Sequence, residues 1–299
     1  MALRAFAPAK VNLFLHVGAP QPDGYHPICS LMAFADVGDR LTALPAEGFG
    51  LKVLGPFAEG LGGDPGENLV VRAARALAAE TGLPIPNFGL VLEKRLPVAA
   101  GLGGGSSDAG AALRLLRGAL APDLADARLE AVAASLGADG AACLWGRPVV
   151  AQGRGELLSE APRAPALDAV LVNAGLPVST PAVYRRLDEA ATFGDVAPPP
   201  MPESLETAAE AAAWLASLRN DLEAPAVAVE PTVGEVLDVL RGEPETLLAR
   251  VSGSGGTCFA MCEDDVAAEG LAARIAGLRP GWWVRRCRLG GPWSDEQAL

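Results

Sequence analysis

A run of glycines in the first half of the sequence limits the possible folds more than any other segment. Residues 101–108 read Gly-Leu-Gly-Gly-Gly-Ser-Ser-Asp, so four glycines in five positions are followed by two hydroxyls. The apolar residues 88–92 predict a strand before the run, and the pattern from Ala109 onward predicts a helix. Free backbone N–H groups at a helix start attract anions, and the helix dipole strengthens the attraction. The run therefore predicts a phosphate-binding loop between a strand and a helix.

The spacing of these glycines does not match the two commonest nucleotide-binding motifs. A P-loop needs a lysine after its last glycine, and none follows here. The dinucleotide fingerprint needs glycine or alanine at position 106, where Ser106 stands. A flexible linker is the remaining alternative, but linkers are usually polar on both sides, whereas this run lies between two apolar segments. Phosphate binding is the favoured interpretation.

The composition indicates an acidic protein with a large core. The chain has 299 residues, of which 50% are hydrophobic, and its formal net charge is −12. This length fits one large domain or two ordinary ones. The negative charge argues against nucleic-acid binding, which needs a basic face, but a small anionic ligand needs only a local basic site.

The cysteines, histidines and apolar runs exclude several other classes of protein. Five scattered cysteines without a C-x-x-C pair predict no disulfide framework and no zinc site, and two histidines are too few for a histidine metal cluster. We therefore predict no metal ligands. Lys10 and Asn12 interrupt the apolar N-terminal stretch, so no secretory signal is expected, and no apolar run is long enough for a membrane span. These features predict a cytoplasmic protein.

Strands and helices alternate along the chain, with a proline-rich boundary near the middle. Residues 161–165 (Ala-Pro-Arg-Ala-Pro) are the predicted boundary between domains 1–160 and 161–299. Strands are expected at 10–17, 28–35, 49–54, 88–92, 169–172 and 282–289, and helices at 69–80, from 109, at 125–136, from 181 to 187 and within 203–240.

Lys10 and Asn12 lie two residues apart on the first predicted strand. The alternation of Val11, Leu13 and Leu15 with polar residues predicts a half-buried strand. Residues i and i+2 face the same side, about 6.5 Å apart. An ammonium and an amide on one side fit either a ligand site or a solvated strand face.

Three further segments have both a structural and a functional interpretation. Residues 23–26 (Asp-Gly-Tyr-His) are typical of a turn, but Tyr25 and His26 could also stack on and hydrogen-bond a planar ring. Asp139 follows the end of a predicted helix, where the dipole disfavours a carboxylate, so it requires a cation or is only a turn residue. Residues 251–256 form a second glycine loop, which fits either a tight hairpin or a support for the first loop.

Three segments, in this order along the chain, resemble the motifs of the GHMP kinases, the superfamily of galactokinase, homoserine, mevalonate and phosphomevalonate kinases. They are residues 7–13, 97–109 and 251–255. Within the superfamily, residues 10–15, 23–26, 101–107, 136–139 and 220–223 are similar to those of the diphosphocytidyl-methylerythritol kinases of the non-mevalonate isoprenoid route. One departure is that Gly140-Ala141-Ala142 follows Asp139, where that family often has valine and proline.

The resemblance implies an α+β, two-domain GHMP kinase fold. The N-terminal domain would hold the nucleotide phosphates on a mixed sheet, and the C-terminal domain would be a helix-rich α/β unit with a small antiparallel sheet. The implied reaction is ATP-dependent phosphorylation of a hydroxyl on the methylerythritol moiety of 4-diphosphocytidyl-2-C-methyl-D-erythritol, with Mg²⁺ accompanying ATP. No nucleic-acid or membrane partner is implied, and we expect a monomer or a weak homodimer.

The resemblance also implies roles for individual residues. Asp139 would orient or deprotonate the attacking hydroxyl, and Lys10 would keep Asp139 ionised and stabilise the transferred group. The implied ATP-binding residues are Asn68 and Lys94 near the adenosine and Gly101, Gly103, Gly104, Gly105, Ser106 and Ser107 around the triphosphate. The implied substrate-binding residues are Asn12, beside the catalytic pair, and Tyr25, His26, Thr180 and Tyr184. The rings of Tyr25, His26 and Tyr184 would hold the cytosine.

Two other functions stay open at this point. The chain could be a GHMP kinase for a smaller alcohol, although the Tyr25–His26 pair and Tyr184 argue against that substrate. It could also be a non-catalytic nucleotide sensor, although such a protein has no need for both Lys10 and Asp139.

Overall fold

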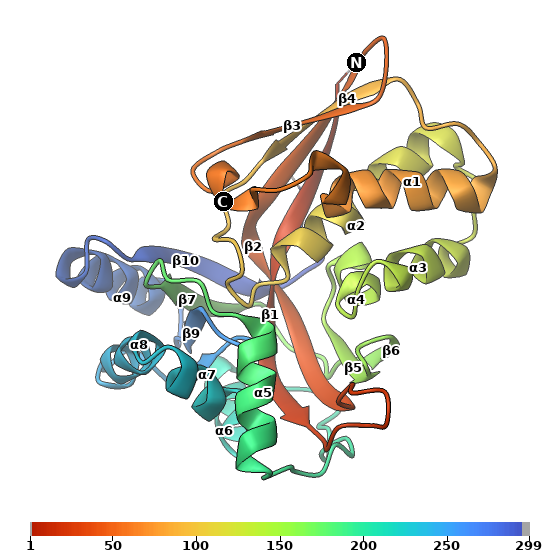
Figure 1. The fold of residues 1–299 in the computed structure, drawn as a ribbon. Coiled ribbons are helices and arrows are strands. Elements are labelled where there is room, and N and C mark those ends of the chain that lie inside the picture. The colour runs from red at the N-terminus through yellow and green to blue at the C-terminus, as the bar shows by residue number, and fades with distance from the viewer. Residues whose placement is uncertain (1, 295–299) are drawn as a thin grey trace.

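One mixed sheet of ten strands runs through the computed structural model, which describes residues 2–294 (Figure 1). Its main path is β3-β4-β2-β10-β7-β9-β8, while β1 and β5 also pair with β2, and β6 pairs with β5. The strands are β1 (Leu3–Val17), β2 (Ile28–Pro45), β3 (Gly50–Leu54), β4 (Phe88–Glu93), β5 (Val149–Gly153), β6 (Leu157–Glu160), β7 (Leu167–Asn173), β8 (Leu248–Val251), β9 (Thr257–Met261) and β10 (Trp283–Gly290).

The first strand is buried on both faces, so the prediction of a half-buried strand is wrong. From Phe6 to Val17 every residue of β1 is buried. The reason is that three separate hydrophobic clusters meet along this strand, with Ala7 in one, Val11 in the second and Val17 in the third. Alternation in sequence reports the polarity of a face, whereas burial depends on what the rest of the chain packs against it.

Helices α1 to α4 pack beside the N-terminal half of the sheet (Figure 1). Helix α1 (Leu69–Thr81) agrees with the predicted helix, since Asn68 caps its N-terminus and Gly82 ends it in the left-handed conformation. The other helices of this half are α2 (Gly104–Leu120), α3 (Asp126–Ser135), α4 (Gly140–Trp145) and the short 3₁₀ turns η1 (Ala58–Leu61) and η2 (Pro65–Glu67).

Helix α2 begins five residues earlier than predicted, at Gly104 instead of Ala109. Glycine disfavours a helix interior, which is why the sequence pattern placed Gly104 and Gly105 in a loop. Gly103 precedes them in the left-handed conformation, with φ of 60°, and turns the chain into the helix. Gly104 and Gly105 therefore belong to the first turn of α2, whereas Gly101 and Gly103 lie before it.

Up to residue 294, the C-terminal half consists of antiparallel strands and five helices. Strands β10, β7, β9 and β8 pair antiparallel, and β10 also pairs with β2 through Leu289 and Gly290. The helices are α5 (Thr180–Ala190), α6 (Ala208–Ala216), α7 (Glu223–Val229), α8 (Thr232–Arg241) and α9 (Asp265–Leu278). This arrangement confirms the predicted α+β class, while the division into residues 1–160 and 161–299 stays a prediction. Between residues 2 and 294, no helix has both the length and the apolar character that a membrane crossing requires.

Candidate active site

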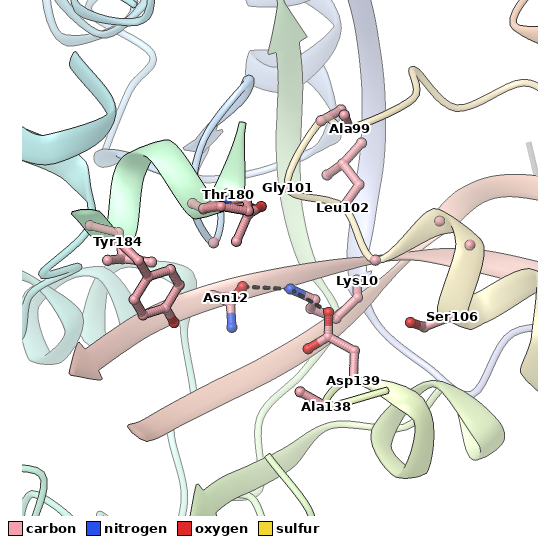
Figure 2. A pocket seen from close by; sticks show the side chains of 18 of the residues that line it. Lys10, Asn12, Ala99, Gly101, Leu102, Ser106, Ala138, Asp139, Thr180 and Tyr184 are labelled. Carbon is pink, nitrogen blue, oxygen red and sulfur yellow. Dashed lines mark hydrogen bonds and ion pairs between the residues drawn. The ribbon is translucent and has the colours of Figure 1, made fainter. Parts of the chain in front are cut away.

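A cavity of about 960 Å³ brings together most of the residues that the sequence singled out (Figure 2). It runs from the N-terminus of α2 to helix α5, over the middle of β1. The predicted residues that line it are Lys10, Asn12, Tyr25, His26, Lys94, Gly101, Gly103, Gly104, Gly105, Ser106, Asp139, Thr180 and Tyr184. Asn68 and Ser107 are the two predicted residues outside the lining. We call residues 101–106 with Lys10 and Asp139 the glycine end, and Tyr25, His26 and Tyr184 the aromatic end.

Lys10 is the centre of the polar contacts at the glycine end. Its Nζ donates to Asn12 Oδ1 at 2.7 Å and lies 3.5 Å from Asp139 Oδ2 (Figure 2). Asn12 Nδ2 in turn donates to Ser30 Oγ at 2.7 Å, which fixes the orientation of the amide. Lys10 is only 4% exposed, so its charge is weakly screened and acts strongly on the carboxylate beside it. The expected side-by-side placement of Lys10 and Asn12 is confirmed.

Asp139 lies at the N-terminus of a helix, a position that the sequence did not predict. It follows the end of α3, as expected, but it also immediately precedes the six-residue helix α4, and its carbonyl accepts from Cys143 N at 2.9 Å. The dipole argument from the sequence was therefore wrong in sign, because a carboxylate at a helix N-terminus is favoured. The short helix was missed because residues 140–145 are too few for a periodic pattern.

The glycine after Asp139 is required by the packing of α3 against α4. A Cβ added at Gly140 would lie 2.0 Å from the carbonyl oxygen of Ala133, so no larger residue fits this backbone path. This close contact explains the departure from the valine and proline that the resemblance implies there. The backbone still places the Asp139 carboxylate beside Lys10.

The start of α2 presents unpaired backbone donors to the cavity. The first intrahelical bond runs from Ser107 N to Gly103 O at 2.9 Å, so the N–H groups of residues 104–106 precede it. The first turn contains no acidic residue, and no side chain caps it. Ser106 lines the cavity, whereas Ser107 is fully buried behind it. This end of the cavity therefore suits a phosphate group.

The second glycine loop supports the first. Residues 252–256 turn the chain between β8 and β9, and Ser252 Oγ donates to Gly101 O at 2.9 Å. A Cβ added at Gly101, whose φ is 74°, would lie 2.3 Å from the carbonyl oxygen of Ser252. The loop is thus both a hairpin turn and a support of the glycine end.

Lys94 takes part in a buried ion cluster directly below the glycine end. Its Nζ donates to a carboxylate oxygen of Asp39 and, at 2.7 Å, to Asp108 Oδ2. Burial raises the pKa of Asp108 to about 8; the Lys94 ammonium opposes this rise, and the Asp39 carboxylate adds to it. A Cβ added at Gly104 would lie 3.1 Å from Lys94 Nζ, so the ammonium lies against the first turn of α2. Its side chain is committed to this cluster, although the residue lines the cavity.

Asn68 has a structural role that the structure makes visible. Its Oδ1 accepts from Val70 N at 2.9 Å and so caps α1. Its neighbour Leu69 lines the cavity instead, together with Leu61. The contacts of Asn68 and Lys94 with an adenosine stay predictions.

The aromatic end is more open and is built from side chains. Tyr25 is 55% exposed, and the guanidinium of Arg154 lies 4.3 Å from the centroid of its ring. The rings of His26 and Tyr184 lie 5.1 Å apart. Burial, with a smaller contribution from the charge of Asp139, raises the pKa of Tyr184 to about 12, so its phenol stays neutral. Thr180, one turn before Tyr184, has its Oγ1 2.7 Å from Ser254 Oγ, which joins α5 to the second glycine loop.

Three charged residues of the aromatic end were not predicted. Arg185 and Asp188 line the cavity beside Thr180 and Tyr184. Together with Pro181, these residues follow the i, i+1, i+4, i+5, i+8 pattern of one face of α5, so helical periodicity could have found them. Arg154 had no such signal, because it follows β5, whose pairing with β2 brings it to Tyr25 across a long sequence separation.

Two protein-family models match parts of this chain. The family described as "GHMP kinases N terminal domain" matches residues 68–147, and "GHMP kinases C terminal" matches residues 201–277. A 4-diphosphocytidyl-2-C-methyl-D-erythritol kinase of Caulobacter vibrioides (strain NA1000 / CB15N) is 64% identical over 290 residues, which are 97% of this chain and 100% of that protein. The corresponding kinase of Hyphomonas neptunium (strain ATCC 15444) is 48% identical and covers 97% of each chain.

Solved structures of two kinases are also similar to this chain. A crystal structure of 4-(cytidine 5'-diphospho)-2C-methyl-D-erythritol kinase has a TM-score of 0.77 and 36% identity, covering 97% of this chain and 100% of its own. A homoserine kinase from Cytophaga hutchinsonii has a TM-score of 0.69 at 18% identity, covering 95% of this chain and 94% of its own, and shares the fold.

Proposed function

This chain belongs to the 4-diphosphocytidyl-2-C-methyl-D-erythritol kinase family of the GHMP kinases, and from that premise we propose the reaction it catalyses. It transfers the γ-phosphoryl group of ATP to a hydroxyl on the methylerythritol moiety of 4-diphosphocytidyl-2-C-methyl-D-erythritol. The observation that carries the proposal is the Lys10–Asp139 pair, 3.5 Å apart, between a free helix N-terminus and a group of aromatic side chains.

Asp139 and Lys10 act on the attacking hydroxyl. The Asp139 carboxylate accepts the hydroxyl proton while the oxygen forms its bond to the γ-phosphorus and the bond to the β,γ-bridging oxygen breaks. ADP leaves with the electron pair of that bond, and the proton passes from Asp139 to solvent. The Lys10 ammonium pairs with the Asp139 carboxylate and stabilises the charge on the transferred group. Asn12, which Lys10 contacts at 2.7 Å, is placed to hydrogen-bond the acceptor beside them.

The glycine end binds the triphosphate of ATP. The N–H groups of residues 104–106 and the dipole of α2 attract the phosphate oxygens. Gly101, Gly103, Gly104 and Gly105 let the backbone approach the phosphates without a side chain in between, and Ser106 adds a hydroxyl. Asn68, which caps α1, and Lys94, which contacts Asp108 of α2, lie near the adenosine in this proposal, and Ser107 belongs to the turn around the triphosphate.

The residues at the glycine end fit a Mg²⁺ ion carried mainly by the nucleotide. Within residues 2–294 no group of three or more His, Cys, Asp or Glu could hold a metal by itself. The side-chain oxygen donors present are the Asp139 carboxylate, immediately before α4, and the Ser106 hydroxyl, in the first turn of α2 (Figure 2). A Mg²⁺ ion that keeps phosphate and water ligands suits such a sparse donor set, and it would supply charge neutralisation of the phosphates.

The aromatic end holds the cytidine. Tyr25 and Tyr184 offer ring faces, and stacking on an aromatic ring contributes about 1–3 kcal/mol per base. His26 packs against Tyr184, and Thr180 lies on the same helix face. The enzyme would act in the cytoplasm, as a monomer or weak homodimer, in the non-mevalonate route to isoprenoid precursors.

An ATP-consumption assay with 4-diphosphocytidyl-2-C-methyl-D-erythritol tests the proposal. We expect ADP formation that depends on this acceptor and a ³¹P NMR signal of a new phosphomonoester. Lys10→Met serves as the inactive control. ATP binding without turnover on this acceptor would contradict the proposal and favour a nucleotide sensor, while turnover on mevalonate or homoserine instead would favour another GHMP kinase.

A further inference from the structure

Ser30 lies outside the lining of the cavity but is connected to the catalytic pair by hydrogen bonds. It is fully buried on β2, and its hydroxyl contacts two groups of β1. Ser30 Oγ donates to the carbonyl oxygen of Phe14 at 2.6 Å and accepts from Asn12 Nδ2 at 2.7 Å. Asn12 Oδ1 in turn accepts from Lys10 Nζ at 2.7 Å. A continuous chain of hydrogen bonds therefore joins a buried hydroxyl to the ammonium beside Asp139.

The direction of each hydrogen bond in this chain is determined from both ends. A carbonyl oxygen can only accept, so the single hydrogen of the Ser30 hydroxyl goes to the oxygen of Phe14. The hydroxyl has only lone pairs left for Asn12, so it pairs with the NH₂ group of the amide. An ammonium can only donate, so Lys10 pairs with the amide oxygen. Both ends therefore require the same orientation of the Asn12 side chain.

The main chain of Asn12 is held by contacts other than those of Ser30. The pairing of β1 with β2 shifts register on both sides of residues 10–12, and such bulges re-aim side chains. Asn12 N donates to Ser252 Oγ at 3.3 Å, which ties this part of β1 to the second glycine loop. The contact of the Ser30 hydroxyl with Asn12 is therefore a contact with the side-chain amide alone.

The Lys10 ammonium carries three hydrogens, and the site offers a partner for each. One is donated to Asn12, one faces Asp139, and the third is left for the transferred phosphoryl group of the proposed reaction. We propose that Ser30 is a positioning residue for phosphoryl transfer, because its hydroxyl holds the Asn12 amide in the orientation that keeps the Lys10 ammonium in place. Without the hydroxyl, an N–H of Asn12 loses its partner in a buried site, which favours rotation of the amide away from Lys10. This proposal rests on the proposed function, since it concerns the same catalytic pair.

The alternative is that Ser30 only supports the strand through its hydrogen bond to the Phe14 carbonyl. Steady-state kinetics of single and double variants separate the two roles. We expect Ser30→Ala to lower kcat by about tenfold to hundredfold and to change KM for ATP by less than about twofold. Ser30→Thr keeps the hydroxyl on a strand that favours β-branched residues, and its kcat should stay within about threefold of that of the unmodified enzyme. If Ser30 acts through Asn12, Ser30→Ala should lower kcat no further in an Asn12→Ala background.

Thr257→Val is the matched control for the loss of a buried hydroxyl. Thr257 is fully buried in the same sheet, and its Oγ1 accepts from Asn173 Nδ2 at 3.1 Å, so the variant also leaves an asparagine amide without its partner. We expect Thr257→Val to lower the melting temperature, as Ser30→Ala does, and to leave kcat unchanged.

NMR of the lysine Nζ atoms in ¹⁵N-lysine-labelled protein tests the proposal without turnover. The chain contains three lysines, Lys10, Lys52 and Lys94, so few signals need assignment. Lys94 is the internal control, because its Nζ contacts two carboxylates that do not belong to the Ser30 chain. We expect Ser30→Ala to shift or broaden the Lys10 signal and to leave the Lys94 signal in place.

Three results would overturn the proposal. They are equal kcat values in Ser30→Ala and Ser30→Thr, additive losses of kcat when Ser30→Ala is combined with Asn12→Ala, and a Lys10 signal that either stays in place in Ser30→Ala or moves together with that of Lys94. If the unmodified protein forms no ADP with the acceptor, the proposed function fails, and the NMR comparison alone decides whether Ser30 positions Lys10.

Discussion

The glycine end and the aromatic end of one cavity are built from different materials. The glycine end consists mainly of backbone N–H groups and an ion pair of buried Lys10, and the ion cluster of Lys94 lies below it; these two lysines are 4% and 2% exposed. At the aromatic end, side chains form the wall of the cavity, and Tyr25 is 55% exposed. A site made of backbone recognises the phosphate that all nucleotides share, whereas a site made of side chains can be specific for one base. The difference indicates that phosphate binding depends mainly on the backbone, whereas in the proposed function the choice of substrate depends on a few replaceable side chains.

The largest effect should come from the carboxylate of the catalytic pair. Asp139→Asn should lower kcat by about 10²–10⁴, because it removes the proton acceptor while it preserves the side-chain volume. Steady-state kinetics should show KM values for ATP and the acceptor close to those of the unmodified enzyme. A kcat within threefold of that of the unmodified enzyme would show that Asp139 is not the general base.

Substitutions at the aromatic end should change the binding of the cytidylyl substrate and nothing else. Tyr25→Ala should raise KM for the cytidylyl substrate by about tenfold to hundredfold, because one stacking face contributes about 1–3 kcal/mol. KM for ATP should change by less than about twofold. Tyr25→Phe is the matched control, since it keeps the ring, and it should behave like the unmodified enzyme. Equal changes in both KM values would break the division between the two ends.

A substitution of a glycine at the glycine end should act through strain in the backbone. Gly101→Ala places a Cβ 2.3 Å from the Ser252 carbonyl oxygen on a residue with φ of 74°, so the two glycine loops must separate. Such strain costs about 1–3 kcal/mol, and we expect a melting temperature lower by several degrees together with a raised KM for ATP. Gly118→Ala on α2 is the control, because a Cβ there meets nothing within 4 Å. A normal KM for ATP in Gly101→Ala would contradict the supporting role of the second loop.

An effect on stability rather than on turnover concerns the buried cluster below the glycine end. The pKa of Asp108 is raised in the folded protein from 3.8 to about 8, so the native state holds a proton that the unfolded chain releases. This contribution to stability is complete below pH 3.8 and is lost as the pH rises through about 8. Asp108→Asn should therefore lose less stability than the unmodified protein between pH 5 and pH 8 in urea unfolding. Parallel profiles would show that Asp108 is not the group that titrates.

Much of the glycine end was predictable from sequence, because its signals are local. The glycine run, Lys10 with Asn12, and Asp139 each stand in a short recognisable segment, and the structure brings them into one cavity. The start of α2 was misplaced because glycine propensity points away from helix, whereas the first turn here is held by contacts with distant segments such as Lys94.

The aromatic end was predictable only in part. Tyr25, His26 and Tyr184 came from motifs, but Arg154 reaches Tyr25 through strand pairing between β2 and β5, which no local pattern reports. The partners of Lys94 were likewise missed, since Asp39 and Asp108 lie 55 and 14 residues away from it. Long-range contacts of this kind depend on the assembled sheet.

The most direct test of the division between the two ends is the rate of ADP formation with two acceptors that differ only in the cytidylyl group. One is 4-diphosphocytidyl-2-C-methyl-D-erythritol, and the other is 2-C-methyl-D-erythritol 4-phosphate, which lacks the base and reaches only the glycine end. We predict acceptor-dependent turnover with the first and a kcat/KM lower by about a hundredfold or more with the second, because the stacking contribution is lost. Equal kcat/KM values for the two acceptors would contradict the account.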